Sequence, residues 1–509
     1  MAGAVVLIGF MGAGKTSAAR TLDAAALDTD AEIERRAGCS IPELFAQRGE
    51  GEFRALEEQV ALELLAAAPP GTPVALGGGT LGSERVRRAL DDHVVAYLEI
   101  DEDTAWARAT ADGITRPLAA DRERFATLLR ERQPVYEAAA DAFLSGDAIP
   151  AAAPALRALT KGTKLIWGPH PVFLGDDAWP AIRDGDYLVT DEHVARLHGE
   201  RFGTLRRHVI APGEQAKSLA TAEATWTAMA RAHVTRAGRV VALGGGVVGD
   251  LAGFCAATYQ RGIPVVQVPT TLVAQVDSAY GGKTGVDLPQ AKNYVGAYHQ
   301  PQAVHVVPAV LETLPPEERA AGYAEVLKTA LIAGGSLWDR VAGGAPVDRD
   351  VILACARTKL AVVAADERDG GVRQTLNLGH TVGHAIETVT GYGRYRHGEA
   401  VGLGLLAALR LSGLPALRDE VRELLAANGL PTELDRAVDP QAVASATRAD
   451  KKRLGDHTPF VLCHGPGDVR PGARIGDAEL LAAVTELADG YAVGRQRVAG
   501  RHAAGPEAL

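Results

Sequence analysis

The chain has 509 residues, more than a single hydrophobic core usually holds, and about three domains of ordinary size fit this length. Its residues are 47% hydrophobic and 23% charged, which excludes a disordered or fibrous protein. The net charge of -10 supplies no general basic field for nucleic acid, so we expect small molecules rather than polyanions as partners.

The cysteines and the apolar runs indicate the compartment. Four cysteines stand far apart and form no CxxC pair, which favours reduced core thiols in a cytoplasmic protein over disulfides or a metal site. No apolar run reaches the roughly 20 residues of a membrane-spanning helix, and the N-terminus lacks the basic flank of a signal peptide. We therefore expect no membrane contact.

Short apolar runs alternate with longer segments of helical periodicity up to about residue 308. These runs lie at 4–8, 73–77, 94–100, 186–190, 239–244 and 263–269. Such alternation predicts parallel sheets with crossover helices. The stretch 151–163 is rich in alanine and small residues and is predicted to be a linker with room for one short helix. The first domain is therefore expected at 1–150 and the second at 164–308.

Beyond residue 308 the strand signal fades and amphipathic helical patterns dominate. Helices are predicted near 315–334, 350–367, 381–389, 399–413 and 418–429. We expect an all-helical domain over 309–495. The remaining stretch, 496–509, has little apolar surface to bury and is expected to be a disordered tail.

The motif GFMGAGKT, residues 9–16, follows the first apolar run and fits the pattern GxxxxGK[ST]. Its glycines let backbone N–H groups turn toward phosphate, its lysine reaches the β and γ phosphates, and its threonine hydroxyl can hold Mg²⁺. We therefore predict an ATP and Mg²⁺ site formed by Gly12, Gly14, Lys15, Thr16 and Ser17.

Two aspartates follow the next short apolar run. At strand spacing, Asp28 and Asp30 would project to one face, into the cleft at the carboxyl end of a parallel sheet. The alternative is a helix N-cap followed by a solvated acidic turn, and this stretch alone leaves both readings open. Downstream, the motifs EFR, GGG, TRP and RQPVY add glycines and three arginines.

Taken together, these motifs resemble shikimate kinase over residues 1–150, in family order and spacing. The resemblance implies that Asp30 accepts the proton of the attacking shikimate hydroxyl, that Asp28 and Thr16 lie on the Mg²⁺ side, and that Arg116 belongs to a lid that stabilises phosphoryl charge. It assigns Arg108 to the adenine on a looser match. The residues that it places around shikimate are Asp30, Arg54, Gly78, Gly79 and Arg132.

Two later glycine-rich stretches need separate explanations. In DSAYGGKTG, Asp277 stands where a P-loop requires its first glycine, so Lys283 is not a P-loop lysine. The stretch LGGGVVGDLAG follows an apolar run and opens a helical pattern, which suits a pyrophosphate at a helix N-terminus. It is not GxGxxG, however, and a tight structural turn remains the alternative.

Histidines supply the strongest signal of the second half. His380 and His384 lie one helical turn apart in NLGHTVGHAIE, and His397 follows in RYRHGEAVG. Thr381 stands where a zinc protease carries its catalytic glutamate, so no hydrolytic base is present. Upstream, Glu325 is available on a predicted helix. Three protein ligands with an open fourth position are typical of a catalytic Zn²⁺ site.

These stretches, in this order, resemble 3-dehydroquinate synthase from about residue 164 to 490. The resemblance implies Zn²⁺ or Co²⁺ on Glu325, His380 and His397, with His384 as an acid–base or phosphate-side group. It implies catalytic roles for Lys283, Lys328, Arg373 and His384. The NAD contacts would be Glu214, Lys217, Gly245, Gly246, Asp250, Thr270, Thr271, Lys283, Lys292, Thr313 and Leu314. The substrate contacts would be Arg261, Asp277, Lys292, Asn293, Lys328, Lys359, Arg373, His384 and Lys452.

The chain departs from this family pattern at three positions near the catalytic lysines. Ala279 and Tyr280 stand where a Ser-Val pair is expected, and Ala291 stands where glycine is expected. Every charged group of the pattern is retained. The departures therefore bear on substrate detail and loop packing more than on the class of reaction.

We therefore expect an α/β protein: a P-loop kinase domain with a parallel sheet, an α/β dinucleotide-binding domain, and an all-helical metal-binding domain. The expected activities are phosphorylation of shikimate and conversion of 3-deoxy-D-arabino-heptulosonate 7-phosphate to 3-dehydroquinate. These are non-consecutive pathway steps, so direct channelling is not expected. Homodimerisation through the synthase half is a family expectation. The alternatives are another sugar-phosphate cyclase in the second half and a non-catalytic regulator.

Overall fold

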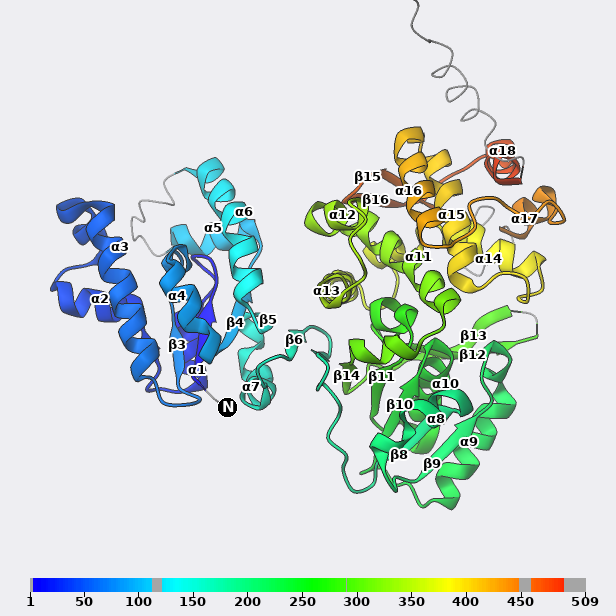
Figure 1. Ribbon diagram of the computed structural model, residues 1–509, viewed down its shortest axis with the longest axis horizontal. Helices are drawn as coiled ribbons and strands as arrows, with labels where there is room; N and C mark the ends of the chain where they lie inside the picture. Colours follow the sequence, from blue (N-terminus) through cyan, green and yellow to red (C-terminus); the bar gives the residue numbers. More distant parts are fainter. Residues whose placement is uncertain (1–2, 112–120, 290, 448–458, 489–509) are drawn as a thin grey trace, which may run out of the picture. The chain divides into compact units, whose positions relative to one another are not determined.

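Strand β1 (Val5–Ile8) is buried along its whole length and is flanked by strands on both sides. In the computed structural model, residues 3–111, 121–289, 291–447 and 459–488 are described. The chain divides into two compact units, Met1–Trp179 and Pro180–Leu509 (Figure 1). The alternation of strands and helices that begins with β1 confirms the predicted α/β class.

The sheet of the first unit has the strand order β2-β3-β1-β4-β5-β6-β7. All neighbouring strands in it are parallel except the last pair. The strands other than β1 are β2 (Leu27–Asp28), β3 (Pro73–Ala75), β4 (Val94–Glu99), β5 (Ala142–Ser145), β6 (Lys164–Trp167) and β7 (Pro171–Leu174). The functional loops of such a sheet gather at the carboxyl ends of its strands.

Helices separate these strands, as the alternation of sequence patterns predicts. They are α1 (Lys15–Leu22), α2 (Thr29–Ala37), α3 (Ile41–Ala67), α4 (Glu84–Ala89), α5 (Glu102–Ala111), α6 (Arg122–Ala139) and α7 (Ile149–Ala158). Helix α3 contains one non-helical residue, Gly49, whose φ of 78° lies in the left-handed region. The helix therefore consists of two segments, and the second carries Arg54.

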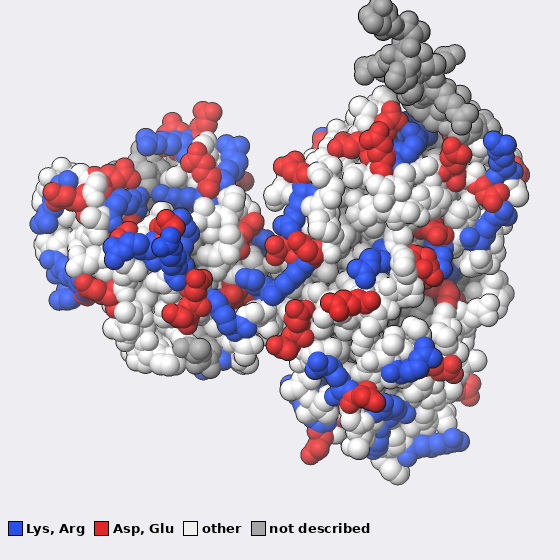
Figure 2. Space-filling model, in the orientation of Figure 1, with Lys and Arg blue, Asp and Glu red and all other residues white. Residues whose placement is uncertain are grey.

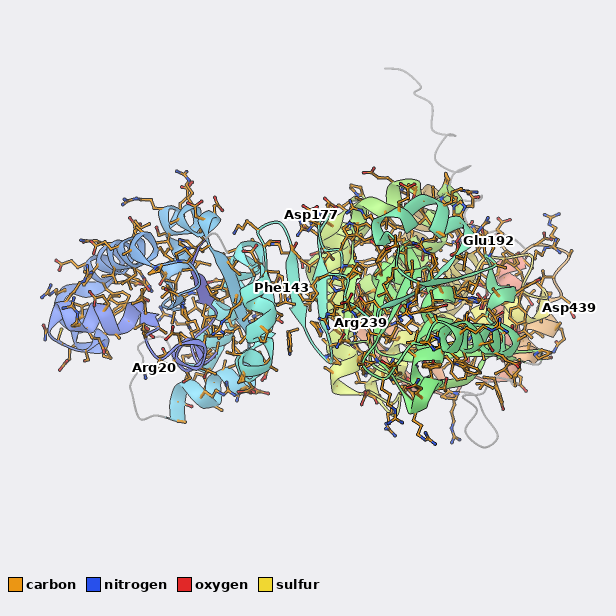
Figure 3. The ribbon with its side chains drawn as sticks, turned by 90° about the horizontal axis from the view of Figure 1, so that it is seen from below. Arg20, Phe143, Asp177, Glu192, Arg239 and Asp439 are labelled. Carbon is orange, nitrogen blue, oxygen red and sulfur yellow. The ribbon has the colours of Figure 1, made fainter. Side chains whose placement is uncertain are left out.

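Helix α7 occupies most of the stretch predicted to be a linker. It buries Ile149, Ala152 and Leu156 in the same core cluster as Leu7 of β1 and Leu165 of β6. The short helix foreseen in this stretch is therefore packed against the first sheet. Phe143 of β5, which is labelled in Figure 3, is also fully buried in this unit.

The second unit begins with its own parallel sheet, in the order β14-β11-β10-β8-β9. Its strands are β8 (Tyr187–Asp191), β9 (Arg207–Ile210), β10 (Val240–Gly244), β11 (Val265–Pro269) and β14 (Ala303–Val306), and its helices are α8 (Glu192–His198), α9 (Leu219–Arg231) and α10 (Gly246–Thr258). Arg239, labelled in Figure 3, forms a buried ion pair of 2.7 Å with Asp186 just before β10 and β8. A hairpin of β12 (Lys283–Leu288) and β13 (Ala291–Tyr298) lies between β11 and β14 in the sequence.

Helices gather on one side of this sheet in Figure 1. They are α11 (Pro316–Ala333), α12 (Gly335–Ala342), α13 (Arg349–Ala365), α14 (His380–Val389), α15 (His397–Leu411), α16 (Pro415–Ala427), α17 (Pro440–Ala446) and α18 (Asp477–Ala488). The helical character of this region is as predicted. It is not all-helical, because β15 (Phe460–Gly465) and β16 (Asp468–Ala473) form an antiparallel hairpin that the sequence patterns did not indicate.

Three of the four cysteines, Cys255, Cys355 and Cys463, are buried, Cys39 is partly buried, and all four are free thiols. Acidic and basic side chains are interspersed on the face of each unit shown in Figure 2. None of the helices formed by the described residues combines the length and the apolar character needed to cross a lipid bilayer. The predicted tail at 496–509 lies outside the described residues.

Candidate active sites

The first candidate site begins at the loop between β1 and α1. Gly14 has a φ of 83° and caps α1, a conformation that favours glycine. Lys15 opens the helix, and its ammonium donates hydrogen bonds to the carbonyls of Gly9, at 2.9 Å, and Phe10, at 3.1 Å. Gly12 lies within the same turn, and Thr16 and Ser17 follow in the first turn of α1. The predicted phosphate loop is thus assembled around one helix N-terminus.

Asp28 joins this loop to the next helix. Its Oδ1 accepts from the backbone N–H groups of Asp30, at 2.9 Å, and Ala31, at 3.1 Å, and so caps α2. Its Oδ2 accepts a 2.6 Å hydrogen bond from the hydroxyl of Thr16. Both readings of this stretch therefore hold in part, because one carboxylate caps a helix and also faces the phosphate loop.

Asp30 lies in the first turn of α2 rather than in the strand, so strand spacing does not govern where its side chain points. The residue as a whole is exposed, but its carboxyl lies close to Gly77 and near the charges of Lys15, Asp28 and Glu57. Burial of this carboxyl outweighs the attraction of Lys15 and raises its pKa to about 6. A carboxylate with such a pKa is suited to accept a proton near neutral pH.

Two arginines meet at the glycines that follow β3. Arg54 forms ion pairs with Glu57, at 2.6 Å, and Glu50, at 3.3 Å. Its guanidinium lies so close to Gly79 that a Cβ atom there would stand 2.2 Å from Nη1. Arg132 donates a 2.8 Å hydrogen bond to the carbonyl of Gly78. The structure thus brings together the residues predicted to hold a carboxylate.

Two buried residues of this cluster had no predicted role. The carbonyl of Gly78 also accepts from the Tyr136 hydroxyl at 2.5 Å, and Glu57 accepts from the Thr80 hydroxyl at 2.9 Å. The spacing of Glu57, three residues after Arg54 on one helix face, was the signal that could have found it. Glu57 therefore holds Arg54 directly, and Tyr136 holds the carbonyl that accepts from Arg132.

A pocket of about 450 Å³ adjoins the loop and is lined by Tyr97, Asp101, Arg108, Gln133 and Asp147, among others. Arg108 reaches the carbonyl of Gly12 at 3.5 Å, so this weakly predicted residue does lie beside the phosphate loop. Arg116, predicted to belong to the lid, lies outside the described residues.

The second candidate site is a cavity of about 1070 Å³ within the second unit. It is lined by residues from the ends of the parallel strands, from the β12–β13 hairpin and from the helices. Predicted residues that line it are Glu214, Lys217, Gly245, Gly246, Asp250, Thr270, Thr271, Asp277, Lys283, Lys292, Asn293, Thr313, Leu314, Lys328, Lys359, Arg373, His380, His384 and His397. Arg261 is not among the described residues that line it, and Lys452 lies outside the described part of the chain.

The glycine-rich loop opens helix α10 at one end of this cavity. Gly245 caps the helix directly after β10, as a pyrophosphate site at a helix N-terminus requires. Beside it, the buried hydroxyl of Thr270 has no hydrogen-bond partner among the described residues. Lys217 forms a 2.8 Å ion pair with Asp250. Burial disfavours the charged form of Lys217, but the neighbouring carboxylates outweigh burial and raise the pKa of this lysine. This end of the cavity fits a dinucleotide in shape and polarity.

Three possible metal ligands converge at the other end. The Nε2 atoms of His380 and His397 lie 3.5 Å and 3.4 Å from Glu325 Oε1. Glu325 is fully buried, and Lys328 forms an ion pair with its Oε2, while its Oε1 faces the two imidazoles. Burial opposes its ionisation, but Lys328 and His380 hold its pKa well below the usual range. A buried carboxylate whose Oε1 faces two imidazoles fits a divalent cation.

Two carboxylates face the imidazole of His397. Burial lowers the pKa of this imidazole, but hydrogen bonds to Glu325 and Glu387 outweigh burial and raise it to about 10. The ring of His384 lies 5.3 Å from that of His380 and 5.9 Å from that of His397. The rings of His380 and His397 lie 5.4 Å apart, so His384 lies beside both predicted ligands, and its acid–base role stays a prediction.

Buried charges surround the region between the two ends. Asp277 accepts from Lys359 at 2.8 Å and from Lys328 at 3.2 Å. Burial raises its pKa, but the two lysines outweigh this and lower it to about 2, whereas burial lowers the pKa of Lys359. Asp277 belongs to a π-helical turn, Ala274–Ser278, and turns of this kind are frequent at functional sites.

The remaining predicted groups are placed around this cluster. Lys283 forms an exposed 2.6 Å ion pair with Asp369, and the buried Arg373 donates to the carbonyls of Gly281, at 2.8 Å, and Glu367. Thr313 contacts His198 at 3.0 Å. Glu387, which had no predicted role, is buried beside His397. Its position seven residues after His380, on the same helix face, was the available signal.

Comparison with protein families divides the chain in the same way. The family model for shikimate kinase matches residues 11–160. The models described as 3-dehydroquinate synthase N-terminal and C-terminal match residues 207–321 and 322–453.

Individual relatives agree with the second match. A 3-dehydroquinate synthase of Symbiobacterium thermophilum is 45% identical over 304 residues, which are 55% of this chain and 85% of that protein. One from Halorhodospira halophila is 44% identical over 325 residues, 59% of this chain and 91% of that protein. Among solved structures, the 2-epi-5-epi-valiolone synthase of Streptomyces hygroscopicus subsp. jinggangensis, with NAD⁺ and Zn²⁺ bound, aligns with a TM-score of 0.58 at 27% identity over 63% of this chain and 97% of its own.

Proposed function

Since the chain belongs to the 3-dehydroquinate synthase family and carries a shikimate kinase domain ahead of it, we propose that it is a bifunctional enzyme of the shikimate pathway. One half phosphorylates shikimate with ATP. The other converts 3-deoxy-D-arabino-heptulosonate 7-phosphate to 3-dehydroquinate and phosphate. The observation that carries the proposal is that the described residues of each unit bring most of its predicted reactive groups together, around the phosphate loop in the first unit and around one cavity in the second.

In the first unit, the chain's groups divide into those for the nucleotide and those for the acceptor. Lys15, Thr16 and Asp28 would hold the phosphates and Mg²⁺ of ATP, which supplies the γ-phosphoryl group. Asp30 accepts the proton of the attacking shikimate hydroxyl. Arg54 and Arg132 orient the shikimate carboxylate, since guanidinium groups match a carboxylate with paired N–H donors.

In the second unit, Glu325, His380 and His397 would hold Zn²⁺ or Co²⁺, and the α10 loop with Thr270 would hold NAD⁺. Together these groups supply a reversible hydride acceptor and a Lewis acid beside the ring hydroxyl. The ammonium groups of Lys328 and Lys359 and the guanidinium of Arg373 line the cavity and would pair with the carboxylate and phosphate of the substrate. His384 and Lys283 stand where a proton can be moved at the rim of the cavity.

The test is a pair of assays on the full chain. Phosphate release from the heptulosonate is measured with NAD⁺ and Zn²⁺, and shikimate-dependent ADP formation is measured with Mg²⁺. We expect His380→Ala to abolish only the first activity and Lys15→Ala only the second. Loss of both in one folded single variant would contradict the assignment of two independent sites.

A related cyclase reaction is the second candidate for the synthase half. It is favoured by the likeness to the valiolone synthase and to a 2-deoxy-scyllo-inosose synthase solved with carbaglucose-6-phosphate, NAD⁺ and Co²⁺, which has a TM-score of 0.56 at 25% identity over 64% of this chain and 99% of its own. The higher identity to dehydroquinate synthases and the kinase domain on the same chain favour the heptulosonate. Turnover of another sugar phosphate without turnover of the heptulosonate would reverse this choice.

We also propose that the chain acts in the cytoplasm and forms a homodimer through its second unit. Its free thiols support a reducing compartment. The family pattern assigns Arg261 to the substrate, yet this exposed residue does not line the cavity of its own unit. In a dimer, Arg261 would reach the cavity of the partner subunit, which makes its action in trans testable.

A further inference from the structure

The buried carboxylate of Glu387 lies beside the outer nitrogen of His397. Its side chain is 2% exposed, and its Oε2 lies 3.4 Å from His397 Nδ1. We propose that Glu387 is a positioning residue of the metal centre, which holds the imidazole of His397 so that Nε2 faces Glu325 and His380. This role rests on the proposed function, because it concerns the metal centre of the synthase half.

The two nitrogens of His397 have different partners. Nε2 faces Glu325 Oε1 at 3.4 Å, whereas Nδ1 faces Glu387. A neutral imidazole carries one proton, and a carboxylate that accepts this proton at Nδ1 leaves the lone pair of Nε2 for a cation. The same contact fixes the ring plane and makes the imidazole a stronger ligand.

The other oxygen of Glu387 is held in place by a lysine. Lys292 Nζ lies 3.0 Å from Glu387 Oε1 and stacks 4.7 Å from the ring centroid of Tyr392. The same ammonium lies 3.5 Å from Glu214 Oε1, in the dinucleotide end of the cavity. Each carboxylate oxygen of Glu387 therefore has its own partner. A carboxylate held in this way can fix the orientation of a metal-ligating imidazole.

A second cation site is the competing explanation of this cluster. Atoms of His384, Glu387 and His397 also lie within 4.8 Å of one another. However, the Lys292 ammonium already neutralises one side of the Glu387 carboxylate. His397 also cannot offer Nδ1 to a cation while it donates the Nδ1 proton to Glu387. The contacts therefore favour one metal ion with a supporting carboxylate.

The experiment titrates the metal-free full chain with Zn²⁺ in competition with a chromophoric chelator. Glu387→Gln keeps the side-chain volume and removes the charge, and we expect it to weaken Zn²⁺ binding by about 10- to 100-fold without changing a stoichiometry of one ion per chain. Glu387→Asp, which keeps a carboxylate, should recover part of the affinity. Glu486→Gln is the matched control, since Glu486 pairs with Arg410 and Arg418 and does not contact a ligand. Its affinity should stay within about two-fold of the parent.

The visible spectrum of the Co²⁺-loaded chain supplies a readout that a purely structural role would not change. It should shift in Glu387→Gln and remain unchanged in Glu486→Gln, because only Glu387 contacts a ligand. Parent-like Zn²⁺ affinity of a folded Glu387→Gln would overturn the proposal, as would two bound ions in the parent that fall to one in the variant. If Glu387→Gln does not fold, Glu387→Ala takes its place, and parent-like Zn²⁺ affinity of that variant would be the overturning result.

These outcomes are separate from those of the proposed function. A parent chain that binds one Zn²⁺ but does not turn over the heptulosonate would refute the activity and still test Glu387. A parent chain that turns over the heptulosonate while Glu387→Gln binds Zn²⁺ normally would refute only the positioning role.

Discussion

The hydroxyl of Thr16, at the end of the phosphate loop, donates a 2.6 Å hydrogen bond to the carboxylate of Asp28, at the end of β2. These are the two groups expected on the Mg²⁺ side of the nucleotide. Asp28→Asn should raise the Mg²⁺ concentration that half-saturates the kinase by about ten-fold or more, since a neutral amide is a poorer partner for a hard cation. Asparagine also caps helices well, so α2 should stay intact.

A Mg²⁺ titration of ADP formation measures this effect, and circular dichroism checks the fold. The synthase activity of the same preparation serves as the control and should not change. An unaltered Mg²⁺ requirement would show that Asp28 is only a helix cap.

The pKa of Asp30, raised from 3.8 to about 6 by burial, predicts the acid limb of the kinase profile. The reactive form is the carboxylate, which predominates above the raised pKa. The kcat/KM for shikimate should therefore fall about ten-fold per pH unit below about 6, rather than below 4. Kinetics from pH 4.5 to 8 measure it. Asp30→Asn should abolish activity across the range, and a limb that stays near pH 4 would exclude Asp30 as the base.

Asp277 is the shared counterion of two buried lysines. Asp277→Asn would leave Lys328 and Lys359 facing each other without it, and should reduce the unfolding free energy of the second unit by about 3–5 kcal/mol and abolish synthase activity. Asp369→Asn is the matched control, because its partner Lys283 is exposed, and should cost about 1 kcal/mol or less. Urea unfolding of the full chain measures both free-energy losses, with proteolytic cleavage of the second unit as the signal. Equal losses of unfolding free energy in the two variants would mean that Asp277 does not neutralise the two buried lysines.

Tyr280, which departs from the family pattern, donates a 2.5 Å hydrogen bond to the carbonyl of Gln275 and so closes the turn that carries Asp277. Tyr280→Phe leaves that buried carbonyl without this donor and should cost about 1–3 kcal/mol. In Tyr259→Phe, the carbonyl of Val234 keeps the amide of Gln260 as a donor, so a smaller loss is expected.

Hydrogen exchange of peptides from the two regions compares these variants. Tyr280→Phe should also raise the KM for the heptulosonate, whereas Tyr259→Phe should not. Identical behaviour of the two variants would remove any special role of Tyr280 in the turn.

The homodimer proposal predicts complementation between two inactive variants. Arg261→Ala and His380→Ala are co-expressed with different tags, and the mixed dimer is isolated. If Arg261 acts in the partner's cavity, one of the two sites is intact, and the mixed dimer should show about half of the parental synthase activity. An inactive mixed dimer would place Arg261 within its own subunit, and a monomeric chain would remove the proposal altogether.

Local patterns predicted the parts of the sites that lie close in sequence. The phosphate loop, Asp28 and the pair His380 and His384 each depend on one strand end or one helix, where periodicity determines direction. The alternation of runs likewise predicted both sheets and the order in which they occur.

The missed features depend on contacts between distant segments. Glu387 contacts His397 only because α15 lies beside α14, and Tyr136 contacts Gly78 only because α6 lies against the loop after β3. The hairpin β15–β16 was missed because its second strand, with a proline and a glycine, has few of the residues that indicate strands. In such cases tertiary packing determines the outcome.

The unequal burial of the cysteines gives the chain a natural attachment point for a probe. Thiol reagents attack the thiolate, and burial raises the pKa of Cys255 to about 12 and also raises the pKa of Cys355 and Cys463. Cys39 is only partly buried, between α2 and α3, and packs against the core cluster that contains Phe53, the residue before Arg54. A single fluorophore attached there, without any engineering, would report shikimate binding while the synthase half remains unlabelled.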